Sequence, residues 1–236
     1  MKLYQYSSKN RMLVAVDCII FGFDGAQLNV LLIRRSFEPE KDKWSLMGGF
    51  VQKEETVEDA AARVLKELTG LNNVYMEQLH VFSEVKRDPI ERTISTVFSS
   101  LIDINAYREQ LNDDYQAQWF PLNKIPSLIF DHRQMIELAK QKLKYKAAFH
   151  PVVFELLPEK FTLPQLLNLY EDIYGSVLDK RNFNRKLLST GLLVKQKDKE
   201  KISSKRGAFY FKLDKRRYQT HFNAFLNFIP NPGNLN

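Results

Sequence analysis

The segment from Gly49 to Leu71 carries the densest group of side chains that could perform chemistry. It reads GFVQKEETVEDAAARVLKELTGL and contains the carboxylates Glu54, Glu55 and Glu67. Carboxylate oxygens are the ligands that hard cations such as Mg²⁺ prefer, and a bound cation can hold a pyrophosphate for hydrolysis. Arg63 lies four residues before Glu67, however, and on a helix the two can pair. The three glutamates are therefore weak metal candidates, and the sequence predicts no metal site and no cofactor.

The spacing of this segment resembles the Nudix box, the signature of a family of metal-dependent hydrolases. The residues at the family's positions are Gly49, Glu55, Arg63, Leu65, Glu67, Gly70 and Leu71. Val64 and Leu68 stand where the family has glutamates, and their four-residue spacing makes a hydrocarbon ledge of that helix face. The resemblance implies an α/β/α sandwich with a cleft beside the box. The two missing glutamates lead us to expect a domain that binds a ligand and is not an enzyme.

Charged and aromatic residues near the box are candidates for contacts with a ligand in that cleft. The indole of Trp44 can form an aromatic wall, and charged side chains can bond hydroxyls or phosphates. The effector-binding candidates are Arg34, Arg35, Lys43, Trp44, Gly49, Asp88, Glu91 and Arg92. His132 is interpreted as an N-terminal residue of a helix rather than as a general base, and no catalytic residue is predicted.

The positive charge of the chain is concentrated near its C-terminal end. Residues 179–217 hold 14 Lys or Arg and 4 Asp or Glu, a net charge of +10, whereas residues 1–178 carry −3. This concentration is typical of a module that binds a polyanion, although a solvated basic face has the same composition. Arg and Asn can read base edges, and wing lysines suit phosphates. The DNA-binding candidates are Lys180, Arg181, Asn184, Arg185, Lys186, Lys199, Lys201, Lys205 and Arg206.

Hydrophobic patterning predicts the elements that must position these residues. Asp24-Gly25 favours a hairpin turn, Thr56 and Gly70 bound the box helix, and Asp131 with Gln134 forms a capping box. The expected strands are 13–23, 28–34, 44–51, 80–84, 93–101, 192–196 and 208–213, and the expected helices are 57–68, 131–146, 151–157, 163–174 and 179–190. The order after residue 147 is that of a winged helix-turn-helix. We therefore predict an α+β fold, with a Nudix-like effector-binding domain at 1–147 and a winged helix DNA-binding domain at 148–236.

The whole chain resembles the Nudix-related transcriptional regulators. Beyond the box, the resemblance is carried by 85–89 (VKRDP), 130–132 (FDH), 161–163 (FTL) and 179–186 (DKRNFNRK). It implies a bacterial repressor or activator that binds double-stranded operator DNA as a homodimer and responds to a small effector. One branch of the family senses ADP-ribose and another serves sugar use.

The sequence leaves more than one candidate for the effector. Met47 replaces a proline that is common before the two glycines, and Gln52-Lys53-Glu54 departs from the hydrolase pattern. These departures favour a pentose such as L-arabinose, with ADP-ribose second. The alternative function is an active Mg²⁺-dependent hydrolase of a nucleoside diphosphate derivative.

Several classes are excluded or disfavoured by composition. Cys18 is the single cysteine, which excludes an intramolecular disulfide and a multi-cysteine zinc site. The apolar run from Met12 to Phe23 is too short to cross a bilayer and is interrupted by Asp17. We expect a cytoplasmic protein without a membrane partner.

Overall fold

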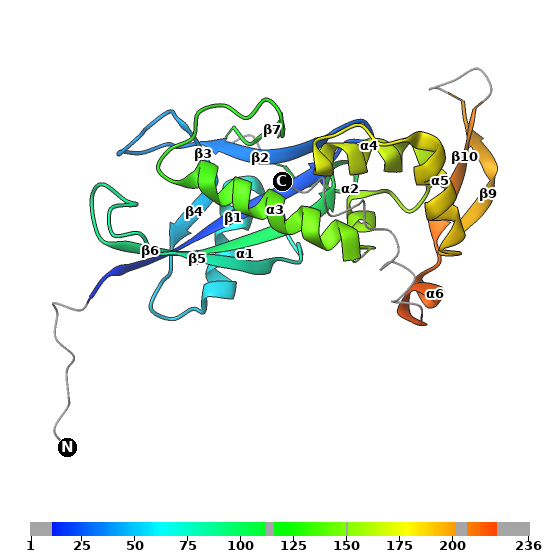
Figure 1. The fold of residues 1–236 in the computed structure, drawn as a ribbon. Helices are drawn as coiled ribbons and strands as arrows, with labels where there is room; N and C mark the ends of the chain where they lie inside the picture. Colours follow the sequence, from blue (N-terminus) through cyan, green and yellow to red (C-terminus); the bar gives the residue numbers. More distant parts are fainter. Residues whose placement is uncertain (1–10, 112–115, 150, 202–206, 221–236) are drawn as a thin grey trace.

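The computed structural model describes residues 11–111, 116–149, 151–201 and 207–220. The described chain forms an elongated molecule with a large sheet at one end and a small helical domain at the other (Figure 1). The predicted α+β fold, a Nudix-like sandwich followed by a winged helix, is confirmed. None of the described helices is long and apolar enough to cross a membrane.

The large sheet is built around β1 (Leu13–Phe23), which is the longest apolar run of the chain. β1 pairs in parallel with β6 (Thr93–Asp103) and antiparallel with β2 (Leu28–Arg34) and β4 (Met47–Phe50). The remaining strands are β3 (Trp44–Ser45), β5 (Glu77–Phe82) and β7 (Gln118–Pro121). The sheet is covered on both faces, which explains why β1 and β2 are nearly continuous hydrophobic runs.

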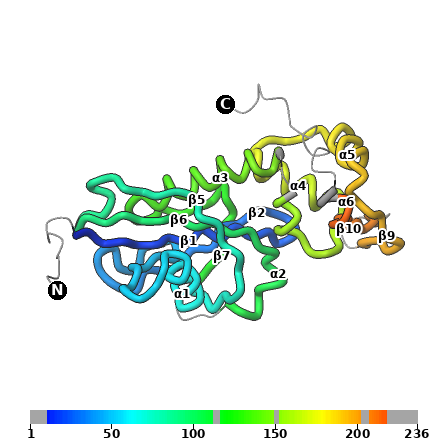
Figure 2. Tube along the Cα trace, turned by 90° about the horizontal axis from the view of Figure 1, so that it is seen from below, coloured from blue at the N-terminus to red at the C-terminus, as the bar shows by residue number. Residues whose placement is uncertain are grey.

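Two helices cover the opposite faces of this sheet, as Figure 2 shows. α1 (Val57–Thr69) begins at a capping box of Thr56 with Asp59 and ends at Gly70, whose φ is +81°. α3 (His132–Phe149) lies on the other face. Alternate side chains of β1 divide between the two sides: Cys18 packs in the α1 cluster and Ile19 in the α3 cluster. A shorter helix, α2 (Ile104–Tyr107), and a 3₁₀ turn, η2 (Arg108–Gln110), follow β6.

The second domain has the order predicted for a winged helix. Its elements are η3 (Pro151–Leu156), β8 (Phe161–Thr162), α4 (Leu163–Tyr174), α5 (Lys180–Ser189), β9 (Leu193–Glu200), β10 (Ala208–Leu213) and α6 (Lys215–Thr220). The strands form a sheet in the order β8-β10-β9. β9 is longer than predicted, because its pairing with β10 continues to Glu200. Lys197 and Lys199 therefore lie on β9, beyond the predicted end of the strand at residue 196, and α6 was not predicted.

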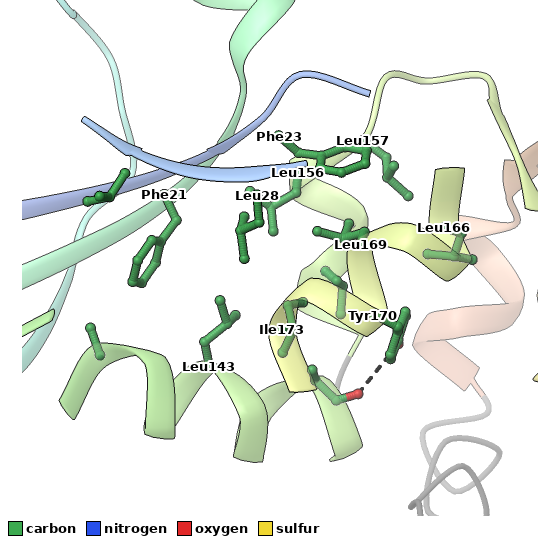
Figure 3. Packing of buried hydrophobic residues seen from close by; sticks show 14 of the residues in the cluster. Phe21, Phe23, Leu28, Leu143, Leu156, Leu157, Leu166, Leu169, Tyr170 and Ile173 are labelled. Atoms are coloured by element: carbon green, nitrogen blue, oxygen red, sulfur yellow. Dashed lines mark hydrogen bonds between the residues drawn. The ribbon is translucent and has the colours of Figure 1, made fainter. Parts of the chain in front are cut away.

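The two domains share one hydrophobic core. Leu169, Tyr170 and Ile173 of α4 pack with Phe21, Phe23 and Leu28 of the sheet and with Leu143 of α3 (Figure 3). Two hydrogen bonds accompany this contact: the Leu28 amide donates to Asp172 Oδ2 at 2.6 Å, and the Tyr170 hydroxyl donates to the Ala147 carbonyl at 3.4 Å. α3 continues to Phe149, so the boundary expected after residue 147 falls in its last turn and stays a prediction.

Candidate functional site

The glycine before the box helix packs against the helix itself. A Cβ built on Gly49 would lie 2.7 Å from Cγ2 of Val64. Val64 is buried, and Leu68, one turn further along, lines a cavity beside the box. Of the two positions at which the resemblance implies glutamates, one therefore adds hydrocarbon to the cavity wall and the other is part of the core.

The surviving carboxylates of the box are held by an arginine. Arg63 donates Nη2 to Glu55 Oε1 at 2.6 Å and Nε to Glu55 Oε2 at 2.9 Å, and its Nη1 lies 3.1 Å from Glu67 Oε2. The Gln52 amide donates to Glu55 as well, at 2.8 Å. The hydrogen bond from Arg63, with that from Gln52, lowers the pKa of Glu55 to about 2. The predicted pairing of Glu67 with Arg63 is confirmed.

This donor set does not fit a divalent cation. Mg²⁺ requires several oxygen ligands in near-octahedral geometry. Within the described ranges, no group of three His, Cys, Asp or Glu side chains is placed to hold a metal. Glu54 is exposed, and Glu55 and Glu67 are engaged by a permanent cation. The carboxylates of the box are therefore committed to Arg63 or to solvent rather than gathered around an ion.

A cavity of about 260 Å³ opens between the box, β1, β2 and the start of α3. We call it the effector cavity. Its volume is near the small end of the range of about 300–1,000 Å³ for ligand pockets. It is lined by Ala15, Asp17, Ile33, Arg34, Arg35, Ser36, Phe37, Ser45, Leu46, Gly48, Gly49, Phe50, Leu68, Arg87, Asp88, Thr93, Phe130 and His132.

Asp17 lies at the bottom of the effector cavity in the middle of β1. Its Oδ2 accepts a hydrogen bond from Ser95 Oγ at 2.6 Å and lies 3.6 Å from Arg87 Nη2. A side chain at Gly48 would collide with the Asp17 carboxylate, so only glycine fits there. A buried charge is tolerated when it is paired and hydrogen-bonded, and both conditions hold for Asp17.

Arg87 and His132 complete what we call the floor network, with Asp17, Ser95 and Asp131. Arg87 donates Nε and Nη2 to the two oxygens of Asp131 at 2.9 and 2.8 Å. The helix begins directly after Asp131, as expected, and the Gln134 amide donates to the Asp131 carbonyl at 2.9 Å. The expected side-chain capping box was wrong, because the Asp131 carboxylate binds Arg87. Such a two-pronged pair is short, strong and directional.

His132 is buried at the first turn of α3. The Leu46 amide donates to Nδ1 at 3.1 Å, so Nδ1 is an acceptor and the ring proton lies on Nε2, 3.5 Å from Asp17 Oδ1. Burial lowers the pKa of His132, against the opposing effect of Asp17, and the ring is neutral. Its assignment as a helix N-terminal residue is confirmed, with an added role in fixing the cavity floor.

Arginine and aromatic rings form the rim of the effector cavity. The Arg35 guanidinium lies 3.9 Å from the centre of the Phe37 ring and 5.8 Å from that of Phe130. The Arg34 guanidinium stacks over Trp44 at 4.8 Å. Phe37 is 57% exposed, so its ring is available to stack with a ligand. The rim can bind an anion and an aromatic group side by side.

The predicted effector residues divide into two groups. Arg34, Arg35, Gly49 and Asp88 line the cavity. The others lie outside its lining: Lys43 pairs with Glu40, Trp44 packs on Phe120 with centroids 4.7 Å apart, Arg92 donates to the Glu84 carbonyl, and Glu91 is exposed. Effector contacts of all eight residues stay predictions.

Asp17, Phe37 and Phe130 line the cavity but were not among the predicted effector residues. Asp17 left a signal that could have been used, since it is a charge inside an apolar strand, where an aspartate needs a buried partner. Phe37 left none, because a loop phenylalanine shows no periodicity that would point to a cavity, whereas Phe130 belongs to the FDH segment that carried part of the resemblance.

The face of α5 carries the candidate DNA contacts. Asp179 caps the helix by accepting from the Asn182 amide at 2.6 Å, and Phe183 and Leu187 are buried. The exposed cations are Lys180, Arg181, Arg185 and Lys186. Asn184 differs from expectation, because its Oδ1 is buried, with no hydrogen-bond partner in the part of the chain that is described. Its predicted role as a base reader therefore has no support from this geometry.

The wing formed by β9 and β10 adds further cations. Lys195 and Lys199 place their ammonium groups 3.7 and 4.4 Å from the centre of the Phe209 ring. Lys201 is exposed directly after β9. Two predicted phosphate contacts, Lys205 and Arg206, lie outside the described residues.

Residues 11–139 match the Nudix domain family, and residues 153–213 match the NrtR DNA-binding winged helix domain family. The matches fall on the sandwich and on the helical domain described above. The chain therefore belongs to the Nudix-related transcriptional regulators, which join a Nudix domain to a winged helix.

Within that class, the chain is similar to proteins named for ADP-ribose. It is 34% identical over 229 residues to the "ADPR responsive transcriptional repressor NtrR" of Acinetobacter baylyi, covering 95% of this chain and 91% of that protein. Shewanella oneidensis NrtR with a 27mer DNA has a TM-score of 0.73 at 30% identity, over 87% and 95% of the two chains. The NUDIX domain of that NrtR, crystallised with ADP ribose, has a TM-score of 0.51 at 31% identity, over 58% and 94%.

Proposed function

We propose that this protein is a transcriptional regulator whose affinity for operator DNA is controlled by ADP-ribose bound in the effector cavity. The observation that carries the proposal is the position of that cavity. It lies beside the box, its cations are arginines rather than a metal, and the domain that contains it shares a core with a winged helix.

The chemistry of the cavity supports ADP-ribose over a pentose. Arg35 and Arg87 can bind phosphate oxygens, and the exposed ring of Phe37 can stack with an adenine. The sequence favoured L-arabinose, but no relative described above supports a sugar, and two of them are named for or crystallised with ADP ribose. A neutral pentose would offer Arg35 and Arg87 no anionic group to bind.

Binding without hydrolysis is part of the proposal. Leu68 and Val64 offer no oxygen to a cation, and Arg63 occupies Glu55 and Glu67. ADP-ribose is therefore held by arginines and hydrogen bonds, and no metal is required. Among the sequence candidates, Arg34, Arg35, Gly49 and Asp88 are the proposed contacts, since these four line the cavity.

The DNA interface is proposed to be α5 with the wing. Lys180, Arg181, Arg185 and Lys186 are exposed on the helix, Lys199 is exposed on β9, and Lys201 follows that strand. We propose a cytoplasmic homodimer on a near-palindromic operator, since a two-fold protein matches two half-sites. Light scattering of the complex should then give two protein chains per duplex.

The experiment that tests this function begins by selecting a DNA sequence that the protein binds. A duplex is selected by the protein from a random pool, labelled, and used in fluorescence anisotropy while ADP-ribose or L-arabinose is added, each with Mg²⁺ and with EDTA. We expect selected DNA to bind tightly, with ADP-ribose alone changing the dissociation constant, equally in Mg²⁺ and EDTA. A response to L-arabinose alone would restore the pentose, and the absence of any response would overturn an effector role.

The hydrolase alternative is tested in the same samples. Turnover of ADP-ribose that requires Mg²⁺ and is abolished by Glu67→Gln would show an active Nudix enzyme. We expect no turnover above that of the Glu67→Gln variant.

A further inference from the structure

Arg87 lies where the effector cavity meets the start of α3. Its side chain is only 4% exposed and lines the cavity. Two of its N–H groups bind Asp131, and Nη2 is also 3.6 Å from Asp17. One guanidinium is thus shared by two carboxylates, one from β1 and one from the residue that precedes α3.

α3 connects this point to the winged helix domain. Its 18 residues span roughly 27 Å at about 1.5 Å per residue. At its far end, Leu143 and Ala147 belong to the core that also contains Ile173 of α4, and the Ala147 carbonyl accepts the Tyr170 hydroxyl (Figure 3). α4 in turn packs on α5, since the centres of the Tyr170 and Phe183 rings lie 5.4 Å apart.

We propose that Arg87 is a switch residue, exchanging Asp131 for an oxygen of the anionic effector and thereby releasing the start of α3. The inference rests on the proposed function, because it requires an anion in the cavity. A phosphate matches the same fork of guanidinium donors that Asp131 now occupies. Once released, the Asp131 carboxylate is a nearly buried charge without its cation, and it lowers its free energy by moving towards water.

This exchange supplies the differential contact that a two-state mechanism needs. A ligand shifts a conformational equilibrium only through contacts that differ between the two states. In the ligand-free state Arg87 binds Asp131, and in the bound state it binds the effector. Because α3 is a rigid helix, a shift at its start also moves Leu143 and Ala147. These two residues form part of the surface on which α4 packs.

The test is Asp131→Asn, measured with ADP-ribose and the selected duplex. The amide keeps the size of the side chain but removes the charge that holds Arg87 in the ligand-free state. We expect the DNA dissociation constant of the ligand-free variant to move at least threefold towards the ligand-bound value of the wild type. ADP-ribose should bind more tightly, and the ratio of DNA affinities with and without ligand should shrink about fivefold or more.

A matched control is Glu137→Gln, which removes one charge from the exposed side of the same helix, where Glu137 pairs with Arg133 and Lys140. We expect this variant to behave as the wild type. If Asp131→Asn does not fold, Arg87→Lys replaces it. This variant keeps the charge but loses the fork, and should shift the ligand-free DNA affinity in the same direction while weakening ADP-ribose binding.

The outcomes separate this inference from the function on which it rests. A wild type that does not respond to ADP-ribose overturns the proposed function, and the inference with it. A wild type that responds, together with an Asp131→Asn variant that responds equally or binds ADP-ribose more weakly, overturns the switch role of Arg87 alone. Tighter ligand binding with a smaller DNA response supports it, because simple structural damage weakens both affinities.

Discussion

Arg63 and Glu55 form a bidentate ion pair within the box. Arg63 Nη2 lies 2.6 Å from Glu55 Oε1, and Arg63 Nε lies 2.9 Å from Glu55 Oε2. In this arrangement the carboxylate that survives from the box is saturated by an arginine of the same box. Leu68 on the cavity side adds an apolar wall. Among the described residues, the charged side chains that line the cavity are Asp17, Arg34, Arg35, Arg87 and Asp88.

Leu68→Glu should make the binding of ADP-ribose in this cavity depend on Mg²⁺. A carboxylate on the cavity wall would repel the diphosphate of ADP-ribose, so we expect the dissociation constant for ADP-ribose in EDTA to rise at least tenfold. Mg²⁺ can bridge a carboxylate and phosphate oxygens, so it should restore part of the affinity. Isothermal titration calorimetry with Mg²⁺ and with EDTA measures both effects. Leu68→Gln is the control of equal size, and its affinity should not depend on Mg²⁺. Equal affinity of the glutamate variant and the wild type in EDTA would place the diphosphate elsewhere.

Gly49→Ala tests the contact between the loop before the box and α1. The added methyl would lie 2.7 Å from Val64 Cγ2, so we expect a loss of about 1–3 kcal/mol in the free energy of unfolding from overpacking. Urea unfolding at pH 7 measures this loss. In a Val64→Ala background the methyl has room, and the cost of Gly49→Ala should nearly vanish. A cost that is unchanged in that background would show that Gly49 is required by its backbone rather than by Val64.

His132 should make the protein sensitive to mild acid. Burial lowers its pKa in the folded state, so between that value and about 6.5 the unfolded chain binds more protons than the folded one. The neutral ring therefore makes its full contribution to the free energy of unfolding above about pH 6.5. This contribution is lost as the pH falls through the folded-state pKa of His132. Urea unfolding from pH 7.5 to 5 measures this, and His132→Gln should flatten the profile.

The exposed His80 supplies the control for that profile. His80→Gln removes a histidine from the surface of β5, and we expect the pH dependence of unfolding to stay that of the wild type. If His132→Gln and His80→Gln left the same profile, the acid sensitivity would come from other groups.

Arg185 and Lys201 should differ in what they contribute to DNA binding. Arg185 is exposed on α5 and held in place by its hydrogen bond to Asn182 Oδ1 at 3.0 Å. If it reads a base, Arg185→Ala costs about 1–3 kcal/mol on the selected duplex and relaxes specificity. Lys201→Ala should weaken all duplexes alike and reduce the slope of log affinity against log salt by about 0.9. Anisotropy on selected and scrambled duplexes distinguishes these effects, and an equal loss on both for Arg185→Ala would make it a phosphate contact.

Local sequence was sufficient for the longer elements and for the box, whereas β7, β8, α2 and α6 were not predicted. The position of Thr56, the apolar period of α1 and the glycine at 70 specify that helix, because caps and periodicity act over a few residues. The pairing of Arg63 with Glu67 follows from their four-residue spacing in the same way. The winged helix order was also visible, since the glycines Gly175 and Gly191, both with positive φ, follow α4 and α5.

Only the tertiary structure shows which residues pair at the floor of the cavity and at the contact between the two domains. Arg87 and Asp131 are 44 positions apart, and the Leu28 amide and Asp172 are 144 apart. No spacing rule predicts such partners, because they are chosen by how the strands, loops and helices pack around the core. For the same reason Asp131 was expected to cap a helix and instead binds Arg87, and Trp44 packs on Phe120 outside the cavity. The sequence determined which residues could do chemistry, whereas burial and long-range packing decided which of them meet.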